Sequence, residues 1–487
     1  MGSLHACKEK VAPASEPVLT SDRALVIITT ELRGYVAPCG CTSNPLGGIA
    51  KLAQLVADKK RSHGEPMIVT AGNFLFESGA SKATTLEQDE ARARVVAEVY
   101  RDAGVLAQTP GPFDLMHGGG KLVRELKNPW LEDGAVVSQR AAELNVAFIG
   151  VRAPPFDPRA LVVKVALARE RNDAVVALTS LDWPQARALA QAVPDLDVVI
   201  AAAAGEPHAP QRLGGTLIVD AGEQGQRVGL LELVRGATAG SKRWAYYDGG
   251  ALELSQLQRQ LAAAESEIAA LPKNVDPALK NLQMGRREDL ARQIAELQNK
   301  PPPPPKERYL RYSLVPLTKK MPDDKSALAK MKAYNATLCE SSKRATEGLE
   351  CEKAPPGAPS YIGSAACGSC HAPALAQWKT TKHAHAVETL EEAGKLCDLS
   401  CIGCHTTGFN AAGGFCSPQK IGALPDVGCE SCHGPGSIHA KTTKTEAPFV
   451  KAPGEALCLQ CHTKEHSDLF DFKTYRPKIL GPGHGAK

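Results

Sequence analysis

Four short stretches of the sequence share the spacing Cys-x-x-Cys-His. Two thiols at this spacing can add to the two vinyl groups of a haem, and the histidine that follows then binds the iron. The same cysteine spacing occurs in thioredoxin-like redox pairs and in halves of zinc sites. All four stretches carry the histidine and lie between residues 367 and 462, which favours four haem c groups over these alternatives. The cysteines are Cys367, Cys370, Cys401, Cys404, Cys429, Cys432, Cys458 and Cys461, and the histidines are His371, His405, His433 and His462.

The second axial ligand of each iron can be narrowed by elimination. Haem irons in cytochromes take histidine or methionine there, and all six methionines lie at or before Met331. Histidine is therefore the expected sixth ligand, and loss of the methionine ligand implies low reduction potentials. The candidates outside the motifs are His383, His385, His439, His466 and His484.

The remaining cysteines and the net charge indicate where the protein is located and which partners it can have. Of 15 cysteines, four near the haem motifs are left over, and we expect local disulfides Cys339–Cys351 and Cys397–Cys416. Disulfides together with haem c indicate export to the periplasm, the outer membrane or the extracellular space. Cys7 could carry a lipid anchor. The net charge of +4 without a basic cluster argues against nucleic-acid binding, and no apolar run is long enough to span a membrane.

The front of the chain, after a leader or linker over residues 1–20, alternates strand and helix patterns. Apolar runs typical of buried strands include 24–29, 66–70, 174–179, 197–202 and 216–219. Helical patterns lie between them at 48–60, 86–103, 158–171 and 184–192. The alternation predicts an α/β layered domain over residues 20–245.

This domain resembles the metallophosphoesterases of the 5′-nucleotidase type. The resemblance rests on 46–52 (LGGIAKL), 70–75 (TAGNFL) and 217–223 (LIVDAGE). At the positions of the family's metal-binding motifs, however, almost every metal ligand is replaced in this chain. The residues at these positions are Glu31-Leu32-Arg33-Gly34, Gly72-Asn73, Gly111-Pro112-Phe113-Asp114 and 202–205 (AAAG). We therefore expect a scaffold without phosphoesterase activity. Cys39 and Cys41 in the first loop could be a metal-binding pair, a redox pair or a disulfide, and their role stays open.

The middle of the chain changes character. Leucines and other apolar residues recur at spacings of three and four over residues 250–300, broken near Pro272–Pro277, which predicts an antiparallel helical hairpin. A proline run at 301–305 opens a linker region, residues 301–360, with a strand at Tyr309–Pro316 and a helix at Ser326–Ser341. Residues 361–487 remain for a loop-rich, mainly α tetrahaem domain.

The last quarter of the chain resembles the multihaem cytochrome family that includes cytochrome c-554. The residues that carry this resemblance are 361–364 (YIGS), Trp378, 382–386 (KHAHA) and 428–437 (GCESCHGPGS) with His439. The resemblance implies His383 and His439 as iron ligands. His385 and His484 are our remaining choices, which leaves His466 as an exposed bystander. Trp378 is expected to be a packed aromatic wall beside a haem.

Four functions follow as hypotheses. The first is electron transfer through four bis-histidine haems to redox protein partners or to an extracellular acceptor. The second is an oxidoreductase that acts on a small nitrogen or sulfur compound at a five-coordinate haem. A surviving nucleotidase is the third. The fourth is a homo-oligomer or conducting filament, in which His484 near the chain end could be exchanged between subunits.

Overall fold

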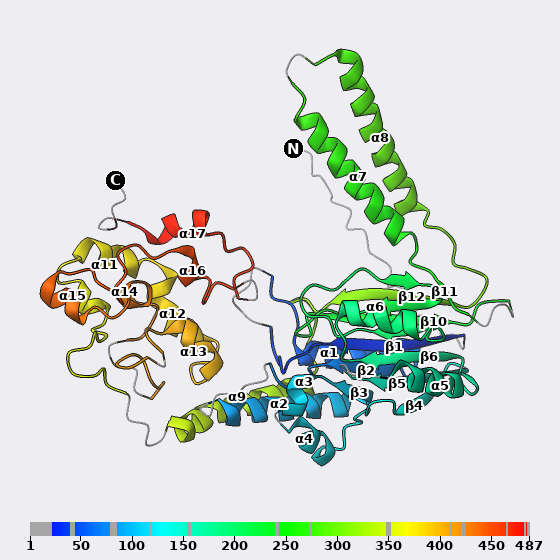
Figure 1. The fold of residues 1–487 in the computed structure, drawn as a ribbon, viewed down its shortest axis with the longest axis horizontal. Coiled ribbons are helices and arrows are strands. Elements are labelled where there is room, and N and C mark those ends of the chain that lie inside the picture. The colour runs from blue at the N-terminus through cyan, green and yellow to red at the C-terminus, as the bar shows by residue number, and fades with distance from the viewer. Residues whose placement is uncertain are drawn as a thin grey trace, which may run out of the picture.

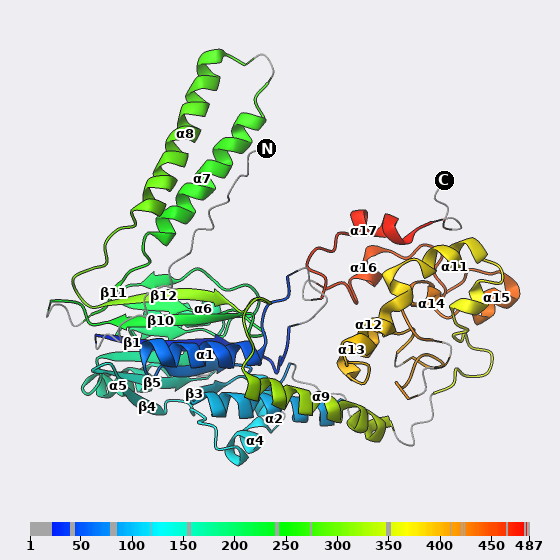
Figure 2. The same cartoon turned by 180° about the vertical axis from the view of Figure 1, so that it is seen from behind.

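The computed structural model describes residues 22–38, 44–77, 85–116, 118–152, 157–238, 243–272, 275–346, 352–409, 411–419, 424–463 and 466–481, together with Gly422 and His484. Cys7, Cys39, Cys41 and Cys351 lie outside these residues, so the expectations for Cys7, Cys39 and Cys41 stay predictions. The described chain forms an α/β body, a projecting helical hairpin and a loop-rich C-terminal region beside the body (Figures 1 and 2). None of its described helices combines the length and apolar character needed to cross a bilayer.

The first sheet of the α/β body is mixed and has the strand order β11-β12-β10-β1-β2-β3. β1, β2 and β3 run parallel, whereas β10 pairs antiparallel with both β1 and β12. β12 coincides with the predicted strand, but it joins this sheet although the sequence placed it in a linker region. The strands are β1 (Arg23–Thr30), β2 (Met67–Gly72), β3 (Val105–Pro110), β10 (Arg227–Val234), β11 (Ala245–Tyr246) and β12 (Tyr309–Pro316).

The second sheet has the order β4-β5-β6-β7-β9-β8, with a parallel centre and an antiparallel strand at each edge. It packs face to face on the first sheet, and Val26, Phe148 and Leu231 lie in the core between them. The strands are β4 (Val136–Ala141), β5 (Leu144–Val151), β6 (Ala174–Thr179), β7 (Val198–Ile200), β8 (Gln211–Leu213) and β9 (Thr216–Val219).

Helices cover the outer face of each sheet and complete a four-layer sandwich, which confirms the predicted α/β layering. One core joins α1, α2 and α9 to the first sheet, and another joins α5 and α6 to the second. α2 coincides with its predicted bounds, whereas α9 extends beyond the predicted helix at both ends. The helices of the body are α1 (Ile49–His63), α2 (Leu86–Ala103), α3 (Pro112–Met116), α4 (Gly119–Glu125), α5 (Pro158–Arg169), α6 (Trp183–Ala192) and α9 (Lys325–Thr346).

The predicted hairpin is confirmed as α7 (Ala251–Ala269) and α8 (Pro277–Asn299), which project away from the sandwich (Figure 1). Within these two helices the buried residues are Ala264 and Leu290, one on each helix. The hairpin is therefore held by a narrow seam, as the spacing of its apolar residues predicts.

The C-terminal region consists of short helices joined by loops, which confirms the mainly α, loop-rich prediction. Its small apolar core contains Leu390, Leu399, Ile402 and Phe415. Such a core is small for a region of this length, as expected where cofactors supply much of the interior. The helices are α10 (Ser364–Cys367), α11 (Ala372–Lys379), the 3-10 helix η1 (Lys382–His385), α12 (Ala386–Glu392), α13 (Leu399–His405), α14 (Cys429–His433), α15 (Ser437–Thr442), α16 (Glu455–Cys458) and α17 (Phe472–Ile479).

Candidate haem-binding site

The four Cys-x-x-Cys-His motifs lie on or directly after short helices of the C-terminal region. α10 ends at Cys367, α13 contains the whole second motif, α14 is the third motif, and α16 ends at Cys458. A helical turn places cysteines three positions apart on one face, with the histidine next to them. All eight motif cysteines are outside disulfides, as thiols that bond a porphyrin must be.

Three motif histidines face a second histidine from elsewhere in the region. The ring centres are 6.1 Å apart for His371 and His439, and 6.0 Å apart for His383 and His462. The His433 and His484 rings are 6.4 Å apart. Two imidazoles bound to one metal by bonds of about 2 Å place their ring centres roughly 6 Å apart. The spacing of all three pairs therefore fits one iron held between two histidines.

His405 of the second motif differs from the other three. In the part of the chain that the structure describes, no second imidazole is paired with it in this way. Its Nδ1 lies 2.6 Å from the backbone oxygen of Ala386, which leaves Nε2 for a metal. His385 lies nearby in sequence, but its two nitrogens contact Glu388 and the backbone oxygen of Lys379. The structure thus does not bring His385 to a motif histidine.

Two more motif histidines have an Nδ1 atom that is engaged in a hydrogen bond. Nδ1 of His433 lies 2.7 Å from the Val450 oxygen, and Nδ1 of His462 lies 3.0 Å from Ser467 Oγ. Burial lowers the pKa of His383 and of His462, and His462 lowers that of His383 further. Neutral imidazoles with Nδ1 engaged are the form that binds iron through Nε2.

Aromatic rings line these histidine pairs. Phe449 stacks on His439 at 4.5 Å and lies 5.8 Å from His433, between the first and third sites. Phe470 stacks on His462 at 4.5 Å. Trp378 has a positioning contact: its Nε1 donates to the Val427 oxygen at 2.9 Å, and the Val427 nitrogen donates to the His383 oxygen at 3.1 Å. Trp378 thus supports the backbone of the candidate ligand His383 through Val427, a contact that its sequence position alone did not reveal.

Contacts between thiols of different motifs order the four sites. The Cys367 and Cys429 thiols are hydrogen-bonded, and this bond together with burial raises the pKa of Cys367. The same bond lowers the pKa of Cys429 to about 6. A second thiol hydrogen bond joins Cys404 to Cys461. The first motif is therefore adjacent to the third, and the second is adjacent to the fourth.

Glu430, inside the third motif, ties three parts of the region together. Its carboxylate is 3% exposed and accepts hydrogen bonds from the backbone nitrogens of Ile362, Gly363 and Gly436 at 2.7–3.0 Å. Gly436 precedes α15, which carries His439. The carboxylate therefore fixes both the approach to the first motif and the turn before a candidate ligand. This hydrogen-bonding role of Glu430 was not predicted from the sequence.

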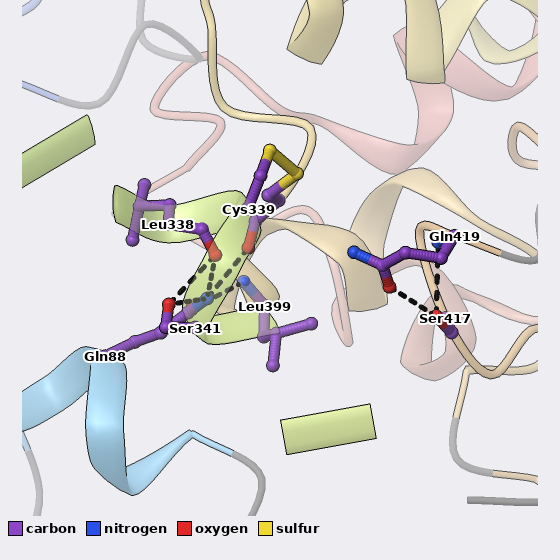
Figure 3. Close-up of a disulfide and its surroundings, with 8 residues drawn as sticks. Gln88, Leu338, Cys339, Ser341, Leu399, Ser417 and Gln419 are labelled. Atoms are coloured by element: carbon purple, nitrogen blue, oxygen red, sulfur yellow. Dashed lines mark hydrogen bonds between the residues drawn. A yellow bond between two sulfur atoms is a disulfide. The ribbon is translucent and has the colours of Figure 1, made fainter. Parts of the chain in front are cut away.

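The disulfide pattern corrects the sequence prediction. Cys339 of α9 is bonded to Cys397, so neither the Cys339–Cys351 nor the Cys397–Cys416 pairing is right. Cys416 is also disulfide-bonded. The predictions paired neighbours in sequence, but α9 extends from the α/β body to the C-terminal region (Figure 1), where Cys339 (Figure 3) is bonded to Cys397.

The strand ends where a phosphoesterase would hold its metals carry an internal ion pair instead. Arg33 Nε donates to Glu31 at 2.9 Å, and a second guanidinium nitrogen lies 3.4 Å from Glu223. Asn73 donates to the same Glu31 from its side chain and its backbone. Two carboxylates are thus balanced by the chain's own cation, and no group of three metal-binding side chains occurs among the described residues. These residues do not fit a two-metal centre.

Two further acidic groups lie at the same strand ends. Burial raises the pKa of Asp114 to about 7, although the backbone nitrogens of Leu75, Phe74 and Gly111 donate to it and oppose this shift. Asp220 lies 2.7 Å from Nδ1 of His208, whose ring stacks on Trp183. Both aspartates are engaged in bonds within the body, which indicates a structural use.

Comparison with known proteins agrees with the haem motifs. Residues 366–434 match the family model described as cytochrome c554 and c-prime, and residues 424–467 match a doubled CXXCH motif. Cytochrome c-554 of Nitrosomonas europaea is 39% identical over 91 residues, which cover 16% of this chain and 39% of that protein. The chain thus spans well under half the length of this relative.

The solved structures that are similar to this chain are of a different kind. A sulfate thiohydrolase from Thermus thermophilus is 15% identical with a TM-score of 0.43, covering 67% of this chain and 62% of that one. A putative 5′-nucleotidase from Staphylococcus aureus in complex with α-ketoglutarate is 12% identical with a TM-score of 0.44, covering 83% and 70%.

Motif chemistry, histidine pairing and the family match converge on one region. The part of the chain from residue 366 to 467 is thus similar to multihaem c-type cytochromes, among them cytochrome c-554, and it is joined to an α/β double-sheet body.

Proposed function

We propose that this chain is an electron-transfer protein that binds four haem c groups covalently through its four motifs. The observation that carries the proposal is the set of three histidine pairs whose ring centres lie 6.0–6.4 Å apart. In this proposal His439, His383 and His484 are the sixth ligands at the first, fourth and third motifs. Bound haem supplies one-electron redox chemistry, and the chain's residues hold it, exclude water and set its potential.

The thiol contacts support a relay order of first, third, fourth and second motif. The first and third motifs are joined through Cys367 and Cys429, and the second and fourth through Cys404 and Cys461. Cys458 acts electrostatically on Cys432, which supports adjacency of the third and fourth. Electrons would then enter or leave at the first or second motif, the two ends of this order.

The α/β body is a scaffold and not a hydrolase in this proposal, because Arg33 engages the carboxylates that a metal would need. The partners are redox proteins or an extracellular acceptor, and the location is outside the cytoplasm, where haem c and the Cys339–Cys397 disulfide coexist. His484 faces His433 of its own chain, so exchange of this ligand in a filament receives no support from the structure.

Spectroscopy on the exported protein tests the electron-transfer proposal. Pyridine haemochrome analysis should give four haems per chain, and low-temperature EPR should show low-spin ferric signals from three bis-histidine sites. His439→Ala, His383→Ala and His484→Ala should each convert one low-spin signal to high spin. Low-spin signals that survive all three substitutions would contradict the ligand assignment, and absence of haem would contradict the function.

A second function is favoured by the environment of His405. Because no described histidine is paired with it, the second motif would hold a five-coordinate haem that is open to a small nitrogen or sulfur compound. A high-spin EPR signal that shifts on addition of nitrite or hydroxylamine, together with turnover, would support this oxidoreductase. An entirely low-spin spectrum that neither compound changes would exclude it.

A further inference from the structure

The α/β body and the C-terminal region are joined by one buried amide. Gln88 of α2 is 4% exposed, and its Nε2 donates to the backbone oxygens of Leu338 at 3.2 Å and Cys397 at 2.9 Å. The same nitrogen lies 3.3 Å from Ser341 Oγ. Gln88 Oε1 accepts from the Leu399 backbone nitrogen at 3.1 Å. One side chain of the body therefore binds α9 and both ends of the segment that enters α13 (Figure 3).

A covalent bond and apolar packing reinforce this contact. The disulfide joins Cys339 of α9 to Cys397, and Cys397 belongs to the same core cluster as Leu338 and Tyr334. The core of the α/β body thus continues into the C-terminal region at this point. The adjacent Asp398 caps α13 by accepting from the Ser400 nitrogen, and its charge acts on Arg92 of α2.

The clamped helix carries the second motif. α13 begins at Leu399, the residue that Gln88 binds, and it ends at His405. Cys401 and Cys404 lie between them, so both attachment points and the iron ligand are within two turns of the clamp. A short helix held rigidly at its first residue transmits that position to its last one.

We propose that Gln88 is a positioning residue for the second motif, and that the α/β body serves to hold the helix of this one haem in place. The inference rests on the proposed haem function. It gives the body a role that needs no phosphoesterase chemistry. Residues that hold a metal ligand in place without binding the metal themselves commonly change metal affinity or activity about 10–100-fold when they are mutated.

Three substitutions separate this role from general stabilisation. Gln88→Leu removes the bonds at similar volume, and Gln88→Asn keeps the amide but shortens its reach. Asn128→Leu is the matched control, because Asn128 is a buried amide that also binds α2, donating to the Ala97 oxygen at 2.8 Å within the body. If Gln88 only stabilised the fold, all three variants would change the protein in the same way. If Gln88 positions the second motif, only the two Gln88 variants should disturb that motif.

Hydrogen exchange and EPR on the full-length exported protein give the readouts. In both Gln88 variants, exchange should quicken about tenfold in segments 396–400 and 335–342 and stay unchanged in β1 and β6. The EPR signal of the second-motif haem should shift or broaden, while the three bis-histidine signals keep their positions. Asn128→Leu should leave all haem signals in place.

The inference is overturned if the Gln88 variants show the hydrogen-exchange rates and the EPR spectrum of the native protein. It is also overturned if the EPR signals of all four haems change together. Should Gln88→Leu fail to accumulate, Gln88→Asn carries the test, because it keeps an amide but cannot reach the same backbone atoms of Leu338, Cys397 and Leu399. Unchanged exchange in the same segments of that variant also overturns the clamp. Failure of the function itself is distinguishable, because it appears as missing haem in the native protein.

Discussion

Replacing Glu430 by alanine should release the sixth ligand of the first-motif haem. The carboxylate of Glu430 holds the backbone nitrogens of Ile362, Gly363 and Gly436, and Gly436 leads into the helix that carries His439. Without it, three N–H groups lose a charged acceptor and the turn before His439 is no longer fixed. We expect His439 to leave the iron in part of the molecules.

The magnitude follows from these bonds. Hydrogen bonds to a charged group contribute about 1.5–3 kcal/mol each, and three of them are lost. The substitution also removes the cost of burying a carboxylate. We therefore expect the free energy that stabilises the local structure around Glu430 to fall by about 3–4 kcal/mol. EPR should then show a new high-spin signal in Glu430→Ala, and a smaller one in Glu430→Gln, which keeps one acceptor oxygen.

The control for this experiment is Glu391→Ala, which removes an exposed carboxylate of the same region. It should leave the spectrum and the stability unchanged. If Glu430→Ala keeps the native low-spin signals and unfolds at the native denaturant concentration, the reasoning about Glu430 is refuted.

Three further outcomes are expected. The raised pKa of Asp114 means that the folded state binds a proton that the unfolded state releases, so stability should fall as pH rises from about 4 to 7; urea titrations of Asp114→Asn should show a flatter dependence. Removing the disulfide, which spans 58 residues, should cost about 4 kcal/mol in the same assay. Charge reversal should slow reduction by an acidic redox protein about tenfold at low salt, but not by dithionite; the lysines to reverse are the exposed Lys441 and Lys444, beside His439, and the exposed Lys451, next to the Val450 whose oxygen contacts His433.

Local patterns in the sequence were sufficient for much of the fold. The strand at Tyr309–Pro316 and the helix at Leu86–Ala103 have the predicted bounds, since apolar spacing encodes the period of each element. The pairing of the strands was not encoded in this way. β12 joins β10 across 75 positions of sequence separation or more, so that a segment expected in a linker region completes the first sheet.

In the candidate site, too, contiguous motifs could be predicted from the sequence, whereas contacts between distant segments could not. The haem motifs are contiguous in sequence, and for that reason they could be recognised without a structure. The pairing of His439 with His371, and of Cys339 with Cys397, depends on how distant segments meet, and the disulfide prediction failed on this point. Gln88 carries no sequence signal, and Glu430 lies within the third motif but its hydrogen-bonding role could not be predicted, because a buried glutamine or glutamate looks like any other polar residue in a helix until its partners are known.

Intact-mass spectrometry of the natively exported protein measures haem attachment at the four motifs in one experiment. We expect a chain heavier than its polypeptide by four haems, with one haem on each of the peptides that contain Cys367, Cys401, Cys429 and Cys458. An unmodified polypeptide, or one that carries zinc, would contradict this expectation.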